Sequence, residues 1–83
     1  MSPEEWFERL TAVLPGEPGG VGAAERDALL DLARIAAHTS ERWTAPVSTF
    51  LAGVALADAS AAQRFAALEQ LIAALDDPDA AAG

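Results

Sequence analysis

Apolar side chains recur at the three- and four-residue spacing of an α-helix in four separate stretches of the sequence. These stretches predict helices over about residues 3–14, 23–39, 46–57 and 61–75. Alternation of β-branched and polar residues, which is typical of strands, is absent from the sequence. The pattern therefore predicts an all-α fold, a single small four-helix bundle over residues 1–76, followed by a flexible acidic tail over residues 77–83.

Helix boundaries are predicted by capping residues and by proline and glycine. Ser2 and Ser60 are each followed three residues later by a glutamate or glutamine, which predicts a capping box at each helix start. Residues 15–22 are rich in proline and glycine, which predicts a linker. A residue before proline avoids the α conformation, so we expect Ala45 to be the last non-helical residue before the third helix, with Thr44 as the alternative capping residue.

The third predicted helix has little polar surface. Its apolar face is Val47, Phe50, Leu51, Val54 and Ala55. A helix that is apolar nearly all round is typically the central one, so we expect this helix to be the most buried. Gly53 in mid-helix costs up to about 1 kcal/mol relative to alanine, and close approach of a neighbouring helix is the expected compensation. The core positions expected on the second and fourth helices are Leu29, Leu32, Ala33 and Ala36, and Ala61, Phe65, Leu68, Ile72 and Leu75.

The charge balance excludes several functions. The chain has 13 acidic residues against 5 basic ones, a net charge of -8, and no cysteine. Sequence-independent binding of nucleic acid needs clustered positive charge, so no nucleic-acid partner is predicted. Disulfides, thiolate metal sites and a catalytic cysteine are excluded. Neither a targeting segment nor an apolar stretch of about 20 residues is visible, so we expect a cytoplasmic protein without a membrane partner.

His38 is the single histidine, and its surroundings give little indication of catalysis or metal binding. Asp31 and Glu41 lie near the same helix face, but the two-histidine or cysteine spacing of a metal site is missing. Ser40 or Ser48 with His38 and Asp31 lacks a nucleophile elbow. The chain has no lysine for a phosphate-binding loop at residues 15–22. We therefore predict no catalytic residue, no metal, no cofactor and no enzymatic activity.

Arg34, His38 and Arg42 place three cationic side chains within nine residues, and Glu41 and Thr49 complete a candidate anion- or partner-binding site. Such a group can hold a phosphate or carboxylate. In the alternative, Arg34 and Arg42 pair with Asp31 and Glu41 as an internal clamp, and the interleaved acids favour this reading. Trp6 and Trp43 similarly have two readings, as core anchors or as contact residues.

The segment 29–55 carries a family resemblance. Its matching elements are Leu30-Asp31-Leu32-Ala33-Arg34, Ala37-His38, Glu41-Arg42, Ala45-Pro46, Thr49-Phe50-Leu51 and Gly53. They resemble a small uncharacterised helical family that occurs free-standing or fused to molybdopterin-guanine dinucleotide biosynthesis proteins similar to the molybdenum-cofactor guanylyltransferase. The guanylyltransferase chemistry belongs to a separate α/β domain and is not implied for this chain.

The resemblance implies a non-enzymatic accessory or protein-interaction domain in molybdenum-cofactor maturation, with a maturation or molybdoenzyme component as partner. Two alternatives stay open. One is a small anion- or nucleotide-binding module that uses Arg34, His38 and Arg42. The other is a purely structural homodimer, in which the fourth helix and the face around Trp6 bury each other.

Overall fold

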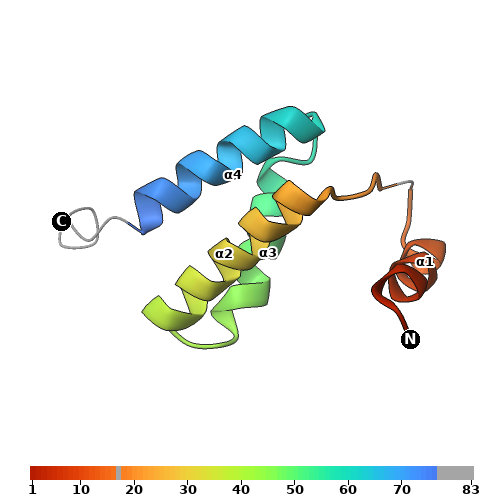
Figure 1. The fold of residues 1–83 in the computed structure, drawn as a ribbon, viewed down its shortest axis with the longest axis horizontal. Helices are drawn as coiled ribbons and strands as arrows, with labels where there is room; N and C mark the ends of the chain where they lie inside the picture. The colour runs from red at the N-terminus through yellow and green to blue at the C-terminus, as the bar shows by residue number, and fades with distance from the viewer. Residues whose placement is uncertain (17, 77–83) are drawn as a thin grey trace.

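Four helices form the chain (Figure 1). A computed structural model describes residues 1–16 and 18–76, so the predicted tail over residues 77–83 lies outside the described residues. The helices are α1 (Pro3–Val13), α2 (Ala23–Thr39), α3 (Thr44–Ala55) and α4 (Ala61–Leu75). The described residues contain no strand. The predicted all-α class with four helices is confirmed.

The core forms where α2 packs against both α3 and α4. Its buried side chains are Ala28 and Leu32 from α2, Ala52 from α3 and Leu68 from α4. The central helix is therefore α2, and the prediction that the third helix is the most buried is wrong. Glu25, Ala28, Leu32 and Ile35 are buried on α2, whereas Ala52 is the one buried residue of α3.

The orientation of α3 also differs from the prediction. Its half-buried and buried positions are all small residues, Thr44, Ala45, Ser48, Thr49 and Ala52, while its large apolar side chains are exposed. A Cβ atom built at Gly53 would meet nothing within 4 Å, so the expected close approach of a neighbouring helix is absent there. Because α3 carries no charged side chain, its sequence has no strongly polar side to mark the solvent-facing surface.

Helix α1 lies apart from the other three in Figure 1. None of its residues is buried. The helix ends before Leu14, and Gly16 follows with a φ of 74°, a left-handed conformation that glycine adopts without the steric cost a Cβ atom brings. Pro15 and Gly16 thus end the helix as the sequence predicts, and the chain turns away towards α2.

Helix α3 begins earlier than expected, at Thr44. The expectation that Ala45 is non-helical is wrong, because Ala45 and Pro46 both lie in the first turn. A proline there loses no hydrogen bond, since the first N–H groups of a helix have no intrahelical acceptor. Thr44 does not cap the helix either: its hydroxyl donates to the carbonyl oxygens of Glu41 at 2.6 Å and Ala36 at 3.1 Å.

The serine caps agree with the sequence. The Ser2 side chain accepts a hydrogen bond from the Glu5 amide at 3.1 Å. At Ser60 the capping box is complete: the hydroxyl accepts from the Gln63 amide at 3.2 Å, and the Gln63 side chain accepts from the Ser60 amide at 2.9 Å. These reciprocal bonds fix the start of α4 and, with it, the position of Arg64 one residue further on.

Replacing Ser60 with alanine is expected to lower the free energy of unfolding by about 1 kcal/mol, because the Gln63 amide loses its acceptor. Equilibrium urea unfolding followed by circular dichroism measures this loss. Gln63→Ala keeps that acceptor and removes only the reciprocal bond, so its expected loss is smaller. A Ser60→Ala variant as stable as the unmodified chain would contradict the role of this cap.

Candidate functional site

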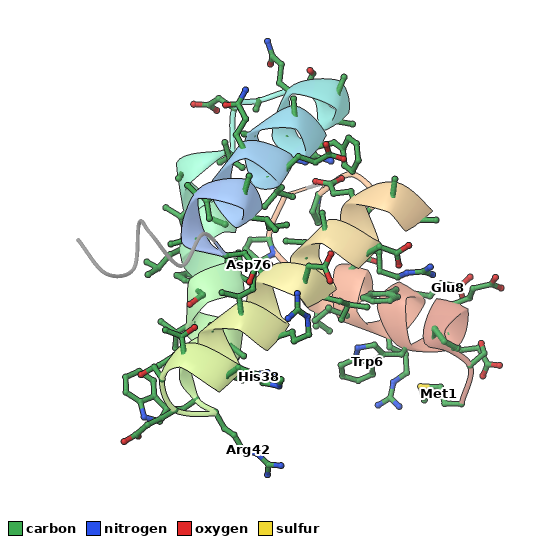
Figure 2. The ribbon with its side chains drawn as sticks, turned by 60° about the vertical axis from the view of Figure 1, so that its left-hand side comes forward. Met1, Trp6, Glu8, His38, Arg42 and Asp76 are labelled. Atoms are coloured by element: carbon green, nitrogen blue, oxygen red, sulfur yellow. The ribbon has the colours of Figure 1, made fainter. Side chains whose placement is uncertain are left out.

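The predicted cationic residues lie along α2 and the turn that follows it. Arg34 is exposed on α2, with its Nε atom 3.8 Å from Asp31 Oδ1. His38 is exposed in the last turn of α2, and Arg42 is exposed in the following turn. Figure 2 shows Arg42 extending away from the helices, beyond the C-terminal end of α2. The weak Arg34–Asp31 pair is the only part of the predicted clamp formed among the described residues.

Glu41 and Thr49 bond to groups other than the cationic residues. The Trp43 indole nitrogen donates to Glu41 Oε2 at 2.7 Å. The Thr49 hydroxyl donates to the Pro46 carbonyl oxygen at 3.0 Å, within the first turns of α3. None of the five predicted site residues lines either of two grooves that run along α2. The anion-binding site therefore stays a prediction.

The two grooves lie along α2. The first has a volume of about 450 Å³ and runs between α2 and α4, with Phe65 and Ile72 among its apolar residues and Asp27, Asp31 and Glu69 among its polar ones. The second, of about 230 Å³, is lined by residues of α2, α3 and Leu75. Residues 1–16 and 18–76 contain no group of three histidine, cysteine or carboxylate side chains placed to hold a metal ion.

A partly buried ion pair joins α2 to α4, and the sequence did not predict it. The Arg64 guanidinium donates from Nε to Glu25 Oε2 at 2.6 Å and from its second nitrogen to Glu25 Oε1 at 2.9 Å. The Glu25 side chain is 9% exposed and that of Arg64 is 26% exposed. One signal existed: both charges fall on the apolar stripe of their helices, three or four residues from Ala28 and Leu68.

The ion pair shifts the titration of both partners. Hydrogen bonds from Arg64 lower the pKa of Glu25 below its ordinary value of 4.5, against the opposing effect of burial. The same hydrogen bonds raise the pKa of Arg64. The pair is internally satisfied, because both carboxylate oxygens accept from the guanidinium. The pair links α2 to α4, and neither of its charged groups is left free to take part in a reaction.

The most extensive unsatisfied feature is an exposed apolar stripe on α3, which we call the α3 outer face. It consists of Trp43, Val47, Phe50, Leu51 and Val54, spaced three and four residues apart. Trp43 is 63% exposed and Phe50 is 67% exposed. The five side chains expose on the order of 500 Å², near the upper end for a monomer. Such a patch is typical of a protein–protein contact.

A second exposed stripe lies on α1, and we call it the α1 apolar face. Its members, Trp6, Phe7, Leu10, Val13 and Leu14, again share one side of a helix. Four of them are exposed and Leu10 is half-buried. Both tryptophans are thus on the surface, so neither is a core anchor, and their role as contact residues stays a prediction. In the described part of the chain, no helix is both long and apolar enough for a membrane span.

Comparison with known proteins places the chain in a family. Neither the curated proteins nor the solved structures include a significant match to it. A family model, described as a domain of unknown function (DUF6457), matches residues 2–82. Because this match covers all four helices and nearly the whole sequence, the chain belongs to the DUF6457 family.

Proposed function

We propose that this chain is a non-enzymatic protein-interaction domain that binds other proteins through the α3 outer face. The observation that carries the proposal is the orientation of α3. This helix packs on α2 through Thr44, Ser48 and Ala52, and it keeps its large apolar side chains on the surface. Leaving Phe50 and Leu51 in water forfeits the free energy that their burial provides, about 2 kcal/mol for each side chain.

The chemistry of the α3 outer face suits a protein surface. Helix α3 has no charged residue, so no charge of this helix must lose its hydration when a partner covers it. Trp43 and Phe50 are aromatic, and aromatic side chains commonly supply most of the binding energy of an interface. The Trp43 indole nitrogen already has an acceptor in Glu41, at 2.7 Å. The ring can therefore be covered without leaving its donor unsatisfied.

The proposed partner is a component of molybdenum-cofactor maturation. The sequence resemblance of residues 29–55 to domains fused with molybdopterin-guanine dinucleotide biosynthesis proteins supports this assignment. Phe50 and Leu51, which belong to the α3 outer face, are among the residues that carry the resemblance. An accessory domain in this role binds a protein and leaves the nucleotide chemistry to its partner. A cytoplasmic location follows from this proposal, because the partner acts there.

The test measures binding of the guanylyltransferase-like protein to the immobilised chain. The unmodified chain is expected to bind it, and Phe50→Asp is expected to weaken binding at least about 30-fold, because a charge then faces an apolar contact. Gln70→Asp places the same charge on the exposed surface of α4 and serves as the control. Its binding should match that of the unmodified chain.

Two outcomes would contradict different parts of the proposal. Lack of binding by the unmodified chain would overturn the assignment to molybdenum-cofactor maturation. Equal binding by the unmodified chain and by Phe50→Asp would overturn the α3 outer face as the contact surface. Circular dichroism checks that Phe50→Asp keeps its helices, which we expect because Phe50 is exposed and outside the core.

A further inference from the structure

We propose that two copies of this chain associate by exchanging their first helices, so that the α1 apolar face of each copy covers the α3 outer face of the other. The inference rests on the proposed function, because it names the occupant of the same surface in the free protein. In such a dimer, one type of contact forms twice about a two-fold axis and covers both exposed apolar faces of each copy.

The two faces match in length and in chemistry. Helix α1 has 11 residues and α3 has 12. The acidic residues of α1, Glu4, Glu5 and Glu8, lie away from its apolar face, whereas Arg9 lies at the edge of that face, three residues from Trp6 and four from Val13. Because α3 has no charged residue, this helix brings no charged side chain of its own into the contact. Trp6 and Phe7 of one copy would meet Trp43 and Phe50 of the other, and aromatic pairs of this kind are favourable at interfaces.

The area available is that of a stable dimer. Each face exposes on the order of 500 Å², so two complete contacts would bury up to about 2,000 Å², compared with about 1,600 Å² for a standard interface.

The position of α1 favours a second copy over the same chain. In Figure 2, α1 and α3 emerge on opposite sides of α2, so α1 does not cover the outer face of its own α3. Residues 14–22 can span up to about 30 Å when extended, which is enough to reach a neighbouring molecule. A Cβ atom built at Gly16, Gly19, Gly20 or Gly22 would meet nothing within 4 Å, so no packing at these positions holds α1 back.

Sedimentation equilibrium of the full chain, from low micromolar to near-millimolar concentration, tests the association. The unmodified chain is expected to form a dimer, and added salt is expected to strengthen it, because two chains of net charge -8 repel each other. Phe7→Asp on α1 and Phe50→Asp on α3 are each expected to weaken the dimer at least about 100-fold. Gln70→Asp is the control and should dimerise like the unmodified chain.

A mixing experiment distinguishes exchange from other dimers. In an equal mixture of Phe7→Asp and Phe50→Asp, one intact α1 meets one intact α3, so heterodimers should form although neither variant associates alone. Energy transfer between separately labelled variants detects them. A monomer at every concentration would overturn the proposal, and so would a dimer that Phe50→Asp abolishes and Phe7→Asp leaves intact. Lack of heterodimers in the mixture would also overturn it.

Failure of this inference can be told apart from failure of the proposed function. If only the exchange is wrong, Phe7→Asp binds the guanylyltransferase-like protein with the same affinity as the unmodified chain, while Phe50→Asp still loses binding. If only the heterologous partner is wrong, the dimer and the mixing result persist without any binding of that protein. If both hold, Phe7→Asp binds the partner more tightly, because no second copy competes for the α3 outer face.

Discussion

Leu68→Ala is expected to lower the free energy of unfolding by about 2–5 kcal/mol, because it removes a buried side chain and leaves a cavity. Leu68 is 1% exposed and is the only large side chain of the described residues that is fully buried. It packs in the cluster that joins α2, α3 and α4. A domain of this length is stable by roughly 4–12 kcal/mol, so this one substitution removes a large share of the total.

Equilibrium urea unfolding, followed by circular dichroism, measures the effect of Leu68→Ala. Leu30→Ala removes the same atoms from a side chain that is 61% exposed on α2, and its expected change is within about 0.5 kcal/mol. A Leu68→Ala variant that is already unfolded in the absence of urea also agrees with the expectation. Similar unfolding midpoints for the two variants would show that the core is not centred on Leu68.

Arg64→Gln is expected to lower the melting temperature by several degrees near neutral pH and to change how stability depends on pH. In the unmodified chain the hydrogen bonds from Arg64 lower the pKa of Glu25. The pair therefore stabilises the fold above the ordinary pKa of 4.5, and this stabilisation disappears as the pH falls through the lowered pKa. In Arg64→Gln the burial of Glu25 is no longer opposed, and the pKa of Glu25 is expected to rise.

The contribution of Glu25 to stability therefore changes with pH in opposite directions in the unmodified chain and in Arg64→Gln. Acidification below the ordinary pKa of 4.5 removes stability from the unmodified chain. In Arg64→Gln, acidification towards pH 4.5 protonates the unpaired Glu25 at its raised pKa and so removes the cost of burying that charge. The gap between their melting temperatures should thus narrow as the pH falls. Arg26→Gln is the matched control, because Arg26 pairs with Asp27 and both side chains are exposed. Parallel curves for the unmodified chain and Arg64→Gln would contradict the role of the ion pair.

The sequence predicts the helices well because their ends carry local signals. Ser2 and Ser60 cap α1 and α4 as expected, and Pro15 with Gly16 ends α1. On α2 the polar residues Asp27, Asp31 and Arg34 are exposed. Of the predicted core positions Leu29, Leu32, Ala33 and Ala36 only Leu32 is buried, and the other buried residues are Glu25, Ala28 and Ile35. The start of α3 is less accessible to such reasoning. A proline is compatible with a helix start both when it lies within the first turn and when it follows a non-helical residue. Pro46 therefore does not fix the residue at which α3 begins.

The packing of α3 could not be read from periodicity. A stripe of large apolar residues and a stripe of small residues lie on opposite sides of this helix, and without any charge the pattern does not say which one faces α2. The structure places Ser48 and Ala52 inwards and Phe50 outwards. The candidate surface thus consists largely of residues that the sequence predicted to be in the core, so their exposure could not be expected from the sequence.

The Glu25–Arg64 pair shows a different limit. The two residues are 39 positions apart in the sequence. The charged residues near each of them do not indicate that the two form a pair. Their position on apolar stripes indicates burial but not the partner, because which charges meet depends on how α2 and α4 cross. The pair is visible only once the helices are packed.

Because the small residues of α3 face inwards, its large ones stay free to be covered, and the proposed association of two copies would make the thermal stability of this protein depend on its concentration. Most of the apolar free energy of α3 is still available in the isolated chain, and any molecule that covers the helix adds to the folded state alone. By mass action, each tenfold rise in such a molecule above its dissociation constant adds about 1.4 kcal/mol to the folded form. If the two copies associate as proposed, the concentration of the protein, and not its core alone, decides the temperature at which the helices unfold.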